Sequence, residues 1–159
     1  MTIELATTAA ANQPPVTHPL IERLCAETGA PLLDAGSFDD WARAGGRALA
    51  VFTEDPVQYR ETLDLAVIVP ELALAFPQRF RTGVLLQQAA RAIAPRYGFK
   101  RWPAVVLLAD GQYVGAIDGL RDWQDYVDEL ARLLAAAPTR APSVGIPVNA
   151  AASSTSHCH

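Results

Sequence analysis

Hydrophobic residues along this chain follow two patterns: short, continuous apolar runs, and longer stretches with apolar residues three or four positions apart. The first pattern is typical of strands buried on both faces, and the second of helices with one face in a core. The continuous runs predict strands at residues 31–33, 47–53, 81–87, 104–109 and 112–117. Helical spacing predicts helices at residues 18–28, 37–44, 56–76, 88–97 and 123–134. The chain is therefore expected to be an α/β protein in which helices and strands alternate until a final pair of consecutive strands.

Turn-forming residues mark the ends of these elements. Asp110-Gly111 separates the last two strand-like runs, and an Asp-Gly pair in this position is the strongest hairpin signal in the sequence. Gly29 and Gly98 each follow a helical stretch, where a glycine often ends a helix. Pro70 lies inside the predicted helix 56–76 and is expected to kink it.

Both ends of the chain differ in composition from its middle. Residues 1–17 are rich in Thr, Ala, Asn and Pro, and residues 136–159 are rich in Ala, Pro, Ser and Thr. Such segments have little apolar surface to bury and are typical of flexible tails. We therefore expect one domain at residues 18–135 between two flexible segments.

The order of elements resembles the thioredoxin fold, in which a proline comes immediately before a β-hairpin and a C-terminal helix. The stretch from Gly98 to Ile117 is similar to the thioredoxin segment that carries a cis-proline. This resemblance implies a central mixed sheet of about four to five strands flanked by helices. It also implies a cis peptide bond between Trp102 and Pro103, where the alternative is an ordinary trans proline at the start of a strand.

The catalytic cysteines of thioredoxins have no counterpart at the corresponding positions of this chain. In that family a CxxC motif opens the helix after the central strand, and a proline kinks the helix one turn later. With Pro70 as the kink proline, the cysteine positions fall near Thr62 and Leu65. Thiol–disulfide exchange needs a thiolate and a resolving partner, so the resemblance does not extend to thiol oxidoreductase activity.

Three further segments resemble the HyaE/HupG/HoxO family of accessory proteins of uptake [NiFe]-hydrogenases. They are Glu54–Val57, Asp64–Leu72 and Phe76–Phe80, and the likeness covers residues 18–134. This resemblance implies a cytoplasmic, non-enzymatic maturation chaperone without cofactors, which recognises the hydrogenase small subunit precursor and its twin-arginine leader before export. The alternative is a scaffold that docks other hydrogenase maturation proteins without binding the leader directly.

The overall charge narrows the classes of partner. The chain of 159 residues has 13 Lys and Arg against 17 Asp and Glu, a net charge of −4. This balance argues against a general nucleic-acid binder and against a surface that binds anionic lipid. No apolar segment is long enough to span a membrane, and residues 1–16 lack the basic and apolar regions of a secretory signal. Because the chain has two cysteines and no CxxC motif, a reducing cytoplasm is expected.

Charge is unevenly distributed within the predicted domain. Residues 34–71 carry eight acids and three arginines, whereas residues 72–109 carry six bases and no acid. The simpler interpretation is that the two halves attract each other in the folded domain. The alternative is a partner site at the C-terminal end of the central strand, where open sheets bind ligands and where carboxylates would pair with the two arginines of a leader. The candidate acids are Glu54, Asp55, Glu61 and Asp64.

An apolar groove near Trp102, Pro103 and Val57 is expected to hold the hydrophobic stretch of such a leader. In the thioredoxin fold, the main chain beside the cis-proline hydrogen-bonds extended peptides, which is a form of strand addition. Trp102 is either an exposed binding anchor or a core residue, and the sequence does not separate the two. Trp41 and Trp123 lie on apolar helix faces and are predicted to be core.

Two remaining groups have reactive or metal-binding side chains. Cys25 lies on the apolar face of the first predicted helix, seven residues after His18, and we interpret it as a small buried hydrophobe rather than a nucleophile. His157, Cys158 and His159 carry metal-ligating groups, but adjacent residues in a flexible tail lack the spacing of a structural zinc site. The remaining alternatives are a metal-delivery protein that uses this trio and an enzyme that uses either cysteine.

Overall fold

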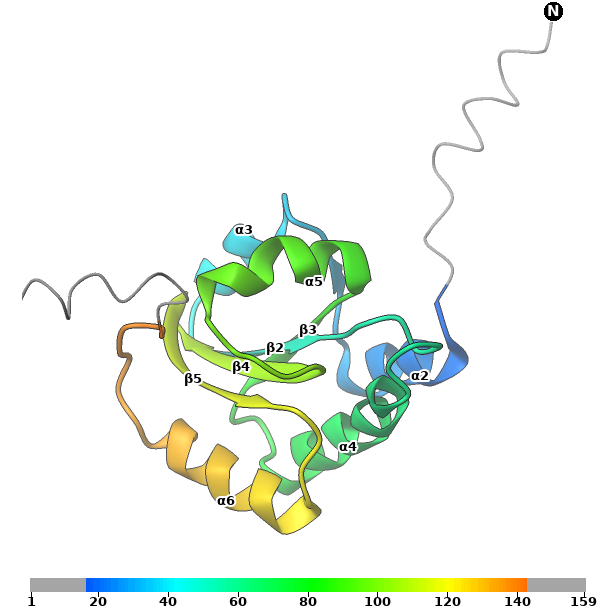
Figure 1. Ribbon diagram of the computed structural model, residues 1–159. Coiled ribbons are helices and arrows are strands. Elements are labelled where there is room, and N and C mark those ends of the chain that lie inside the picture. The colour runs from blue at the N-terminus through cyan, green and yellow to red at the C-terminus, as the bar shows by residue number, and fades with distance from the viewer. Residues whose placement is uncertain (1–16, 143–159) are drawn as a thin grey trace, which may run out of the picture.

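A five-stranded mixed sheet lies between two layers of helices (Figure 1). The computed structural model describes residues 17–142, and its elements follow the predicted order. The helices are α2 (Pro19–Thr28), α3 (Phe38–Arg43), α4 (Glu61–Ala75), α5 (Gln87–Ile93) with a 3₁₀ turn at Ala94–Arg96, and α6 (Trp123–Leu134). The strands are β1 (Leu32–Leu33), β2 (Arg47–Phe52), β3 (Arg81–Leu85), β4 (Ala104–Ala109) and β5 (Gln112–Asp118).

The strand order β1-β3-β2-β4-β5 places β2 at the centre of the sheet. β1, β3 and β2 run parallel, β4 is antiparallel to β2, and β5 is antiparallel to β4. Because β2 is covered on both faces, its sequence is continuously apolar. Its last residue, Phe52, lies opposite Ala104 of β4, which in turn lies opposite Asp118 of β5. The connections that leave these residues therefore meet at one end of the sheet.

Alternate residues of β2 contribute to two separate cores. Leu49 and Val51 face α2, α4 and α6, whereas Ala50 and Phe52 face α3 and α5. Figure 1 shows the same division, with α3 and α5 on one side of the sheet and the other three helices on the opposite side. In the second core Phe52 meets Phe99 edge-on, with ring centroids 5.2 Å apart, so the segment before β4 is fixed against the core.

α4 begins later than the sequence predicts. A start near Pro56 is expected, whereas the helix begins at Glu61. The main-chain carbonyl of Asp55 accepts a hydrogen bond from the N–H of Tyr59 at 2.8 Å, and turns fill the space between them. Pro70 lies inside the helix, as predicted. The connection between β2 and α4 is therefore longer than expected, and it adds loop to the end of the sheet where β2 stops.

Ordered chain continues beyond α6. The N–H of Thr139 donates a hydrogen bond to the carbonyl of Tyr113 on the outer edge of β5 at 2.8 Å, and Ala141 packs against the second core. In Figure 1 this orange segment rises from α6 to β5. The expected start of a flexible segment at residue 136 is therefore too early.

Residues 1–16 and 143–159 lie outside the part of the chain that the structure describes. The rest of the expected flexible ends and the trio His157, Cys158 and His159 fall there. Between residues 17 and 142, no helix combines the length and the apolar character needed to cross a membrane.

Candidate functional site

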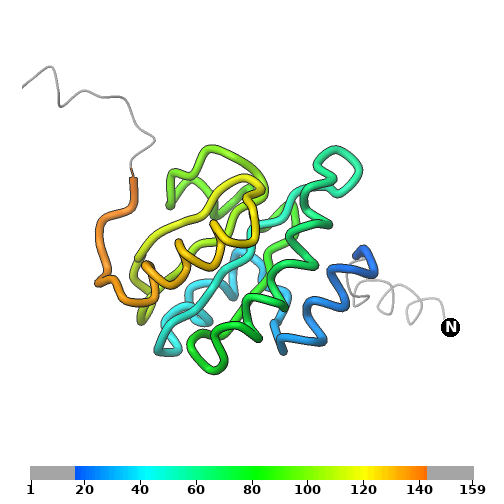
Figure 2. The backbone as a smooth tube through the Cα atoms, turned by 90° about the horizontal axis from the view of Figure 1, so that it is seen from below, coloured from blue at the N-terminus to red at the C-terminus, as the bar shows by residue number. Residues whose placement is uncertain are grey.

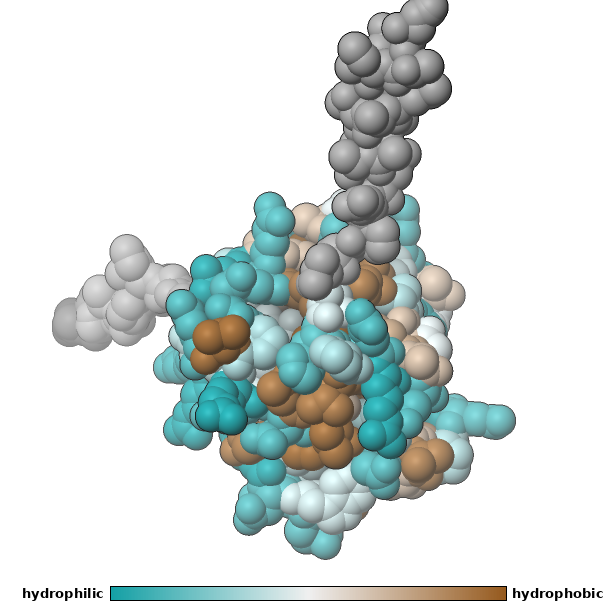
Figure 3. All heavy atoms as spheres, turned by 90° about the vertical axis from the view of Figure 1, so that its right-hand side faces the viewer, coloured by the Kyte–Doolittle hydropathy of each residue, from teal (hydrophilic) through white to brown (hydrophobic). Residues whose placement is uncertain are grey.

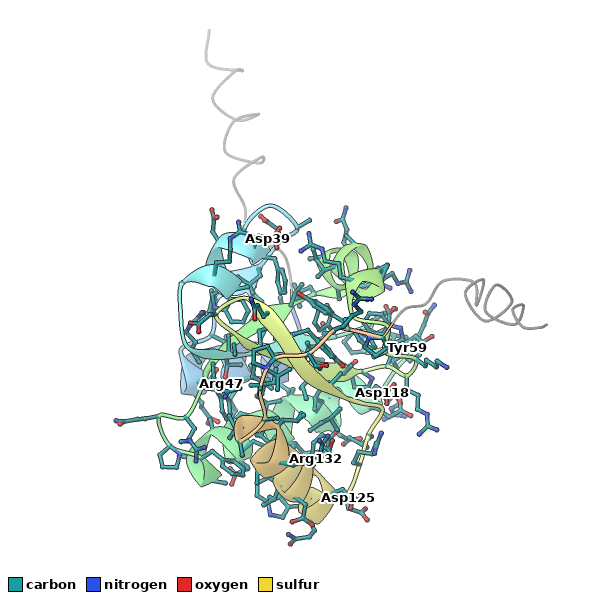
Figure 4. The ribbon with its side chains drawn as sticks, turned by 90° about the vertical axis from the view of Figure 1, so that its left-hand side faces the viewer. Asp39, Arg47, Tyr59, Asp118, Asp125 and Arg132 are labelled. Carbon is teal, nitrogen blue, oxygen red and sulfur yellow. The ribbon has the colours of Figure 1, made fainter. Side chains whose placement is uncertain are left out.

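Three connections meet at the end of the sheet where β2 stops. They are residues 53–60 after β2, residues 97–103 before β4 and residues 119–122 after β5. The strand register brings them together, because the last residue of β2 faces the first of β4, which faces the last of β5. Figure 2 shows these connections along one end of the molecule. Figure 4 places Tyr59 and Asp118 at this end, away from the side on which Arg47 begins β2.

The peptide bond between Trp102 and Pro103 is cis, as predicted. The carbonyl of Pro103 accepts a hydrogen bond from the N–H of Gly119 at 2.8 Å, which joins the connection before β4 to the one after β5. Within residues 17–142, neither the main-chain N–H nor the carbonyl of Trp102 has a hydrogen-bond partner. One main-chain donor and one acceptor therefore remain beside the cis-proline, and such groups can pair with an extended peptide.

The Trp102 side chain is neither fully exposed, as a binding anchor would be, nor fully buried, as a core residue would be. It is half-buried, and its ring meets Phe99 edge-on with centroids 5.1 Å apart. The prediction that Trp123 is core is wrong: it is 44% exposed, and it is the first residue of α6, one turn before the first buried position of that helix, Tyr126. Exposed apolar side chains thus occur in the connections after β2 and after β5, at Val57, Tyr59 and Leu120, and at Trp123, the first residue of α6.

Asp118 holds the connection before β4 in place. Its carboxylate accepts the main-chain N–H groups of Lys100 at 2.8 Å and Arg101 at 3.2 Å, and it pairs with Arg121 at 3.3 Å. Burial by itself raises the pKa of this carboxyl, but these hydrogen bonds outweigh burial and lower the pKa below its ordinary value. No motif in the sequence marks Asp118, whose only signal is its place directly after a predicted strand.

Glu54 is a buried support of this end of the sheet. It is 3% exposed; one carboxylate oxygen accepts Nε–H of Arg91 at 2.7 Å, and the other accepts the main-chain N–H of Asp55 at 2.9 Å. Burial by itself raises the pKa of the Glu54 carboxyl, but hydrogen bonds from Arg91, Asp55 and Gln87 outweigh burial and lower the pKa. The carboxylate is therefore charged, paired and shielded from an incoming arginine.

The positions that correspond to the thioredoxin cysteines, Thr62 and Leu65, are both buried. Thr62 lies in the first turn of α4, and its Oγ1 accepts a hydrogen bond from the main-chain N–H of Glu54 at 3.2 Å. Leu65 belongs to the first core. Near the position at which the resemblance places a thioredoxin nucleophile, this chain therefore has a hydroxyl that anchors the loop after β2.

Cys25 lies within α2, and His18 is the N-cap residue of the same helix. Cys25 is half-buried, and burial raises the pKa of its thiol, with a smaller contribution from Glu22, so the nucleophilic thiolate is disfavoured. Nδ1 of His18 accepts the main-chain N–H of Leu20 at 3.1 Å and caps the helix. Across the described residues, no three His, Cys, Asp or Glu side chains form a group that could hold a metal ion.

The other three candidate acids lie on two elements. Asp55 is half-buried, and its carboxylate accepts the main-chain N–H two residues further on at 3.1 Å. Glu54 contributes most to the raised pKa of the Arg91 guanidinium, and the charge of Asp55 adds to it. Glu61 and Asp64 are exposed on the first turn of α4. The fold thus brings Glu54 and Asp55 together at the end of β2 and places the other two acids on the outside of a helix.

Sequences and structures similar to this chain come from one group of accessory proteins and from thioredoxins. The family model described as Hydrogenase-1 expression protein HyaE matches residues 20–126. Hydrogenase expression/formation protein HoxO of Cupriavidus necator is 43% identical over 143 residues, which cover 89% of this chain and 88% of that protein. Hydrogenase expression/formation protein HupG of Rhodobacter capsulatus is 31% identical over 121 residues, which cover 76% of this chain and 88% of that protein. The solved structure of a mutant thioredoxin from Halobacterium salinarum has 26% identity and a TM-score of 0.51 over 70% of this chain and 96% of that one, which confirms a thioredoxin-like fold.

Proposed function

The chain belongs to the HyaE family of hydrogenase expression proteins, and from this premise we propose that it is a non-catalytic chaperone in the maturation of an uptake [NiFe]-hydrogenase. Its relatives are named for hydrogenase expression and formation, which supports a maturation role. The proposed partner is the precursor of the small subunit, and the proposed contact includes its twin-arginine leader. Binding takes place in the cytoplasm, before export.

The state of the thioredoxin-like site is the observation that carries a binding role. In thioredoxins a cysteine is the nucleophile, whereas near the corresponding position this chain has Thr62, whose hydroxyl accepts a hydrogen bond from the N–H of Glu54. The part that pairs with peptides is open, because the main-chain groups of Trp102 have no partner among the residues described. The chain keeps the main-chain groups beside Pro103 that can pair with a peptide, but it lacks the cysteine nucleophile. This combination supports recognition of a peptide rather than catalysis.

An extended segment of the precursor adds main-chain hydrogen bonds at Trp102 and apolar contacts on either side of it. Val57 lies in the connection after β2, and Leu120 lies in the connection after β5. Trp123 supplies a large aromatic anchor, the residue class that dominates binding energy at interfaces. Full burial of each such apolar side chain stabilises a complex by about 1.5–3 kcal/mol.

The arginines of the leader pair with carboxylates that the fold leaves accessible. Two acids of residues 34–71 pair with arginines of residues 72–109, since Asp39 pairs with Arg96 at 2.6 Å and Glu54 pairs with Arg91 at 2.7 Å. Mutual attraction between the two charged segments therefore explains part of the charge pattern. Guanidinium–carboxylate pairs make bidentate, charge-assisted hydrogen bonds. The carboxylates available for them are Asp55, Glu61 and Asp64.

Calorimetric titration of the full chain with a synthetic small-subunit leader tests the proposal, beside a matched leader whose two arginines are lysines. We expect saturable binding that weakens with the lysine leader and with added salt, because lysine cannot pair bidentately and salt screens exposed charges. The triple variant Asp55→Asn/Glu61→Gln/Asp64→Asn should bind the arginine leader more weakly. The control Asp125→Asn/Asp128→Asn on α6 should bind it as the wild type does.

Absence of binding to both leaders would overturn leader recognition. Titration with a folded small subunit that lacks the leader then separates the remaining possibilities. Binding to that subunit keeps the chaperone role at another surface of the precursor, whereas no binding favours the scaffold alternative.

A further inference from the structure

α4 leaves a face without a partner on the outside of the described structure. From Glu61 to Ala75 its sequence contains three acids and no base, and its other residues are almost all apolar. A helix that is apolar on every side is normally buried. In this helix, however, five residues at spacings of three and four form an exposed row. The row is Glu61, Asp64, Val67, Glu71 and Leu74.

The apolar members of this row are strongly exposed. Val67 is 51% exposed and Leu74 is 74% exposed. Val67 also lines a small groove between α2 and α4, together with Leu20, Ala66 and Pro70 and with the charged residues Arg23, Glu27 and Glu71. Figure 3 faces the side of the molecule on which α2 lies, and it shows apolar side chains gathered in the middle of that face within a hydrophilic border. Contiguous apolar surface with a polar rim marks contact with a partner.

The acidic members of the row form no ion pair within the described residues, although the pKa of the Arg23 guanidinium on α2, raised mainly by Glu27, is raised further by the charge of Glu71. Among residues 17–142, none of Glu61, Asp64 and Glu71 takes part in an ion pair. Arg23 of α2 borders the groove, but its guanidinium pairs with Glu27 at 2.8 Å. A face that combines exposed apolar side chains with unpaired acids is complementary to a segment that is both apolar and basic.

We propose that this row is the docking strip for the arginine pair and the apolar run of the leader, an inference that rests on the proposed function. The arginines bind Glu61 and Asp64, which stand about one turn apart at the start of α4. The apolar run lies along Val67 and Leu74 as a helix packed on α4. Two acids come first along α4, and the exposed Val67 and Leu74 follow with Glu71 between them. A leader that runs parallel to α4 therefore places its arginines at Glu61 and Asp64 and its apolar run further along the helix.

The length of the strip fits the same occupant. Thirteen positions separate Glu61 from Leu74, which is about 20 Å of helix. The apolar region of a signal peptide has roughly 7–15 residues, which as a helix cover about 10–22 Å. This assignment places the apolar run on α4 instead of beside Trp102. The main chain at Trp102 then receives extended residues next to the arginine pair.

Substitutions on α4 test the strip with two peptides, the full leader and a shortened peptide that keeps the arginines but lacks the apolar run. We expect Val67→Asp/Leu74→Asp to weaken the full leader at least tenfold in calorimetry and to leave the shortened peptide unchanged. Glu61→Gln/Asp64→Asn should weaken both peptides. The matched control Leu32→Asp changes an exposed leucine on β1, and it should bind both peptides as the wild type does.

The outcomes separate this inference from the function on which it rests. If the wild type binds the full leader and Val67→Asp/Leu74→Asp binds it equally well, the strip is wrong and the proposed function stands. If the wild type binds no leader, both the docking strip and leader recognition are overturned. Sedimentation that shows a wild-type dimer abolished by the same variant assigns the face to a second copy and overturns the strip. The milder variant Val67→Ser/Leu74→Ser, checked by circular dichroism, supplies the same test if the aspartates disturb folding.

Discussion

The end of the sheet beside Pro103 and the outer face of α4 are both rich in acids, but the fold uses their carboxylates in opposite ways. At the first, Glu54 and Asp118 turn inward and accept main-chain N–H groups of neighbouring loops. On the second, Glu61 and Asp64 are exposed and have no ion-pair partner in the described chain. The acidic residues of these two regions thus divide into those that stabilise the fold and those that are candidates for recognition.

The supply of unpaired main-chain donors explains the division. Loops have N–H groups outside helices and strands, and a carboxylate within reach satisfies them. At the start of α4, the N–H groups of Thr62 and Leu63 are already taken by the carbonyls of Tyr59 and Arg60. Two main-chain donors of this turn are thus occupied, and within the described chain neither the Glu61 nor the Asp64 carboxylate accepts a hydrogen bond, so both remain available to a partner.

Removal of the Glu54 carboxylate is expected to produce the largest loss of stability. Glu54→Ala leaves the N–H of Asp55 and the Arg91 guanidinium without their acceptor, and we expect the free energy of unfolding to fall by about 2–3 kcal/mol. Glu61→Ala on α4 is the matched comparison, with an expected change within about 0.5 kcal/mol. Urea denaturation of both variants checks the pair. Equal losses of unfolding free energy in the two variants would show that Glu54 and Glu61 do not differ in their contribution to the fold.

Asp118→Ala is expected to have a smaller and more local effect. It removes the acceptor of the Lys100 and Arg101 N–H groups and should cost about 1–2 kcal/mol of unfolding free energy. Amide hydrogen exchange should accelerate at these two residues, because their hydrogen bonds lose the acceptor. Asp125→Ala, at an exposed position of α6, serves as the control and should leave both exchange rates unchanged.

The pH dependence of stability sharpens the same comparison. The folded pKa of the Glu54 carboxyl lies below its ordinary value of 4.5, so its stabilising contribution is present above that pH and is lost as the pH falls through the folded pKa. We therefore expect the stability difference between the wild type and Glu54→Gln to be constant near neutral pH and to shrink below about pH 4.5. Urea titrations across this range measure it. A difference that grows on acidification would contradict the lowered pKa.

Changes to the apolar positions of the α4 row should affect stability least. Val67→Ser/Leu74→Ser alters side chains that are mostly in solvent, and we expect the unfolding free energy to change by no more than about 0.5 kcal/mol. Thermal unfolding followed by circular dichroism checks this. A drop comparable to that of Glu54→Ala would show that the row supports the fold and is not a free face.

The order of elements was predictable because it depends on local signals. The continuous apolar run at β2, the Asp110-Gly111 turn and the helical spacing of α6 each specify an element within a few residues. The cis peptide bond at Pro103 followed from the resemblance to thioredoxins. The predicted start of α4 near Pro56 was wrong because no local signal in the sequence marks it. The helix begins at Glu61, since hydrogen bonds within the preceding loop replace the expected first turn.

The candidate site was predictable only in part. Trp102, Pro103 and Asp55 lie at the predicted end of the sheet, but Glu54 is buried and Asp118 was not anticipated. The sequence does not show whether the partner of an acidic side chain is water, an arginine or a backbone N–H. The choice between these partners depends on residues 18 to 37 positions away, the separations of Asp118 from Lys100 and of Glu54 from Arg91.

The helices, the strands and their order could be predicted from the sequence, because periodicity and turn residues are properties of the chain, whereas the thioredoxin-like fold, the family and the missing thioredoxin thiols followed from resemblance to known proteins. Only the tertiary structure shows which carboxylates form hydrogen bonds within the fold and which are exposed without an ion-pair partner in the described chain. Burial and hydrogen bonding arise when distant segments meet, and these set the charge and accessibility of each group. On that basis Glu54 and Asp118 hold the loops around the cis-proline, while Glu61, Asp64 and the apolar residues of α4 form the exposed row.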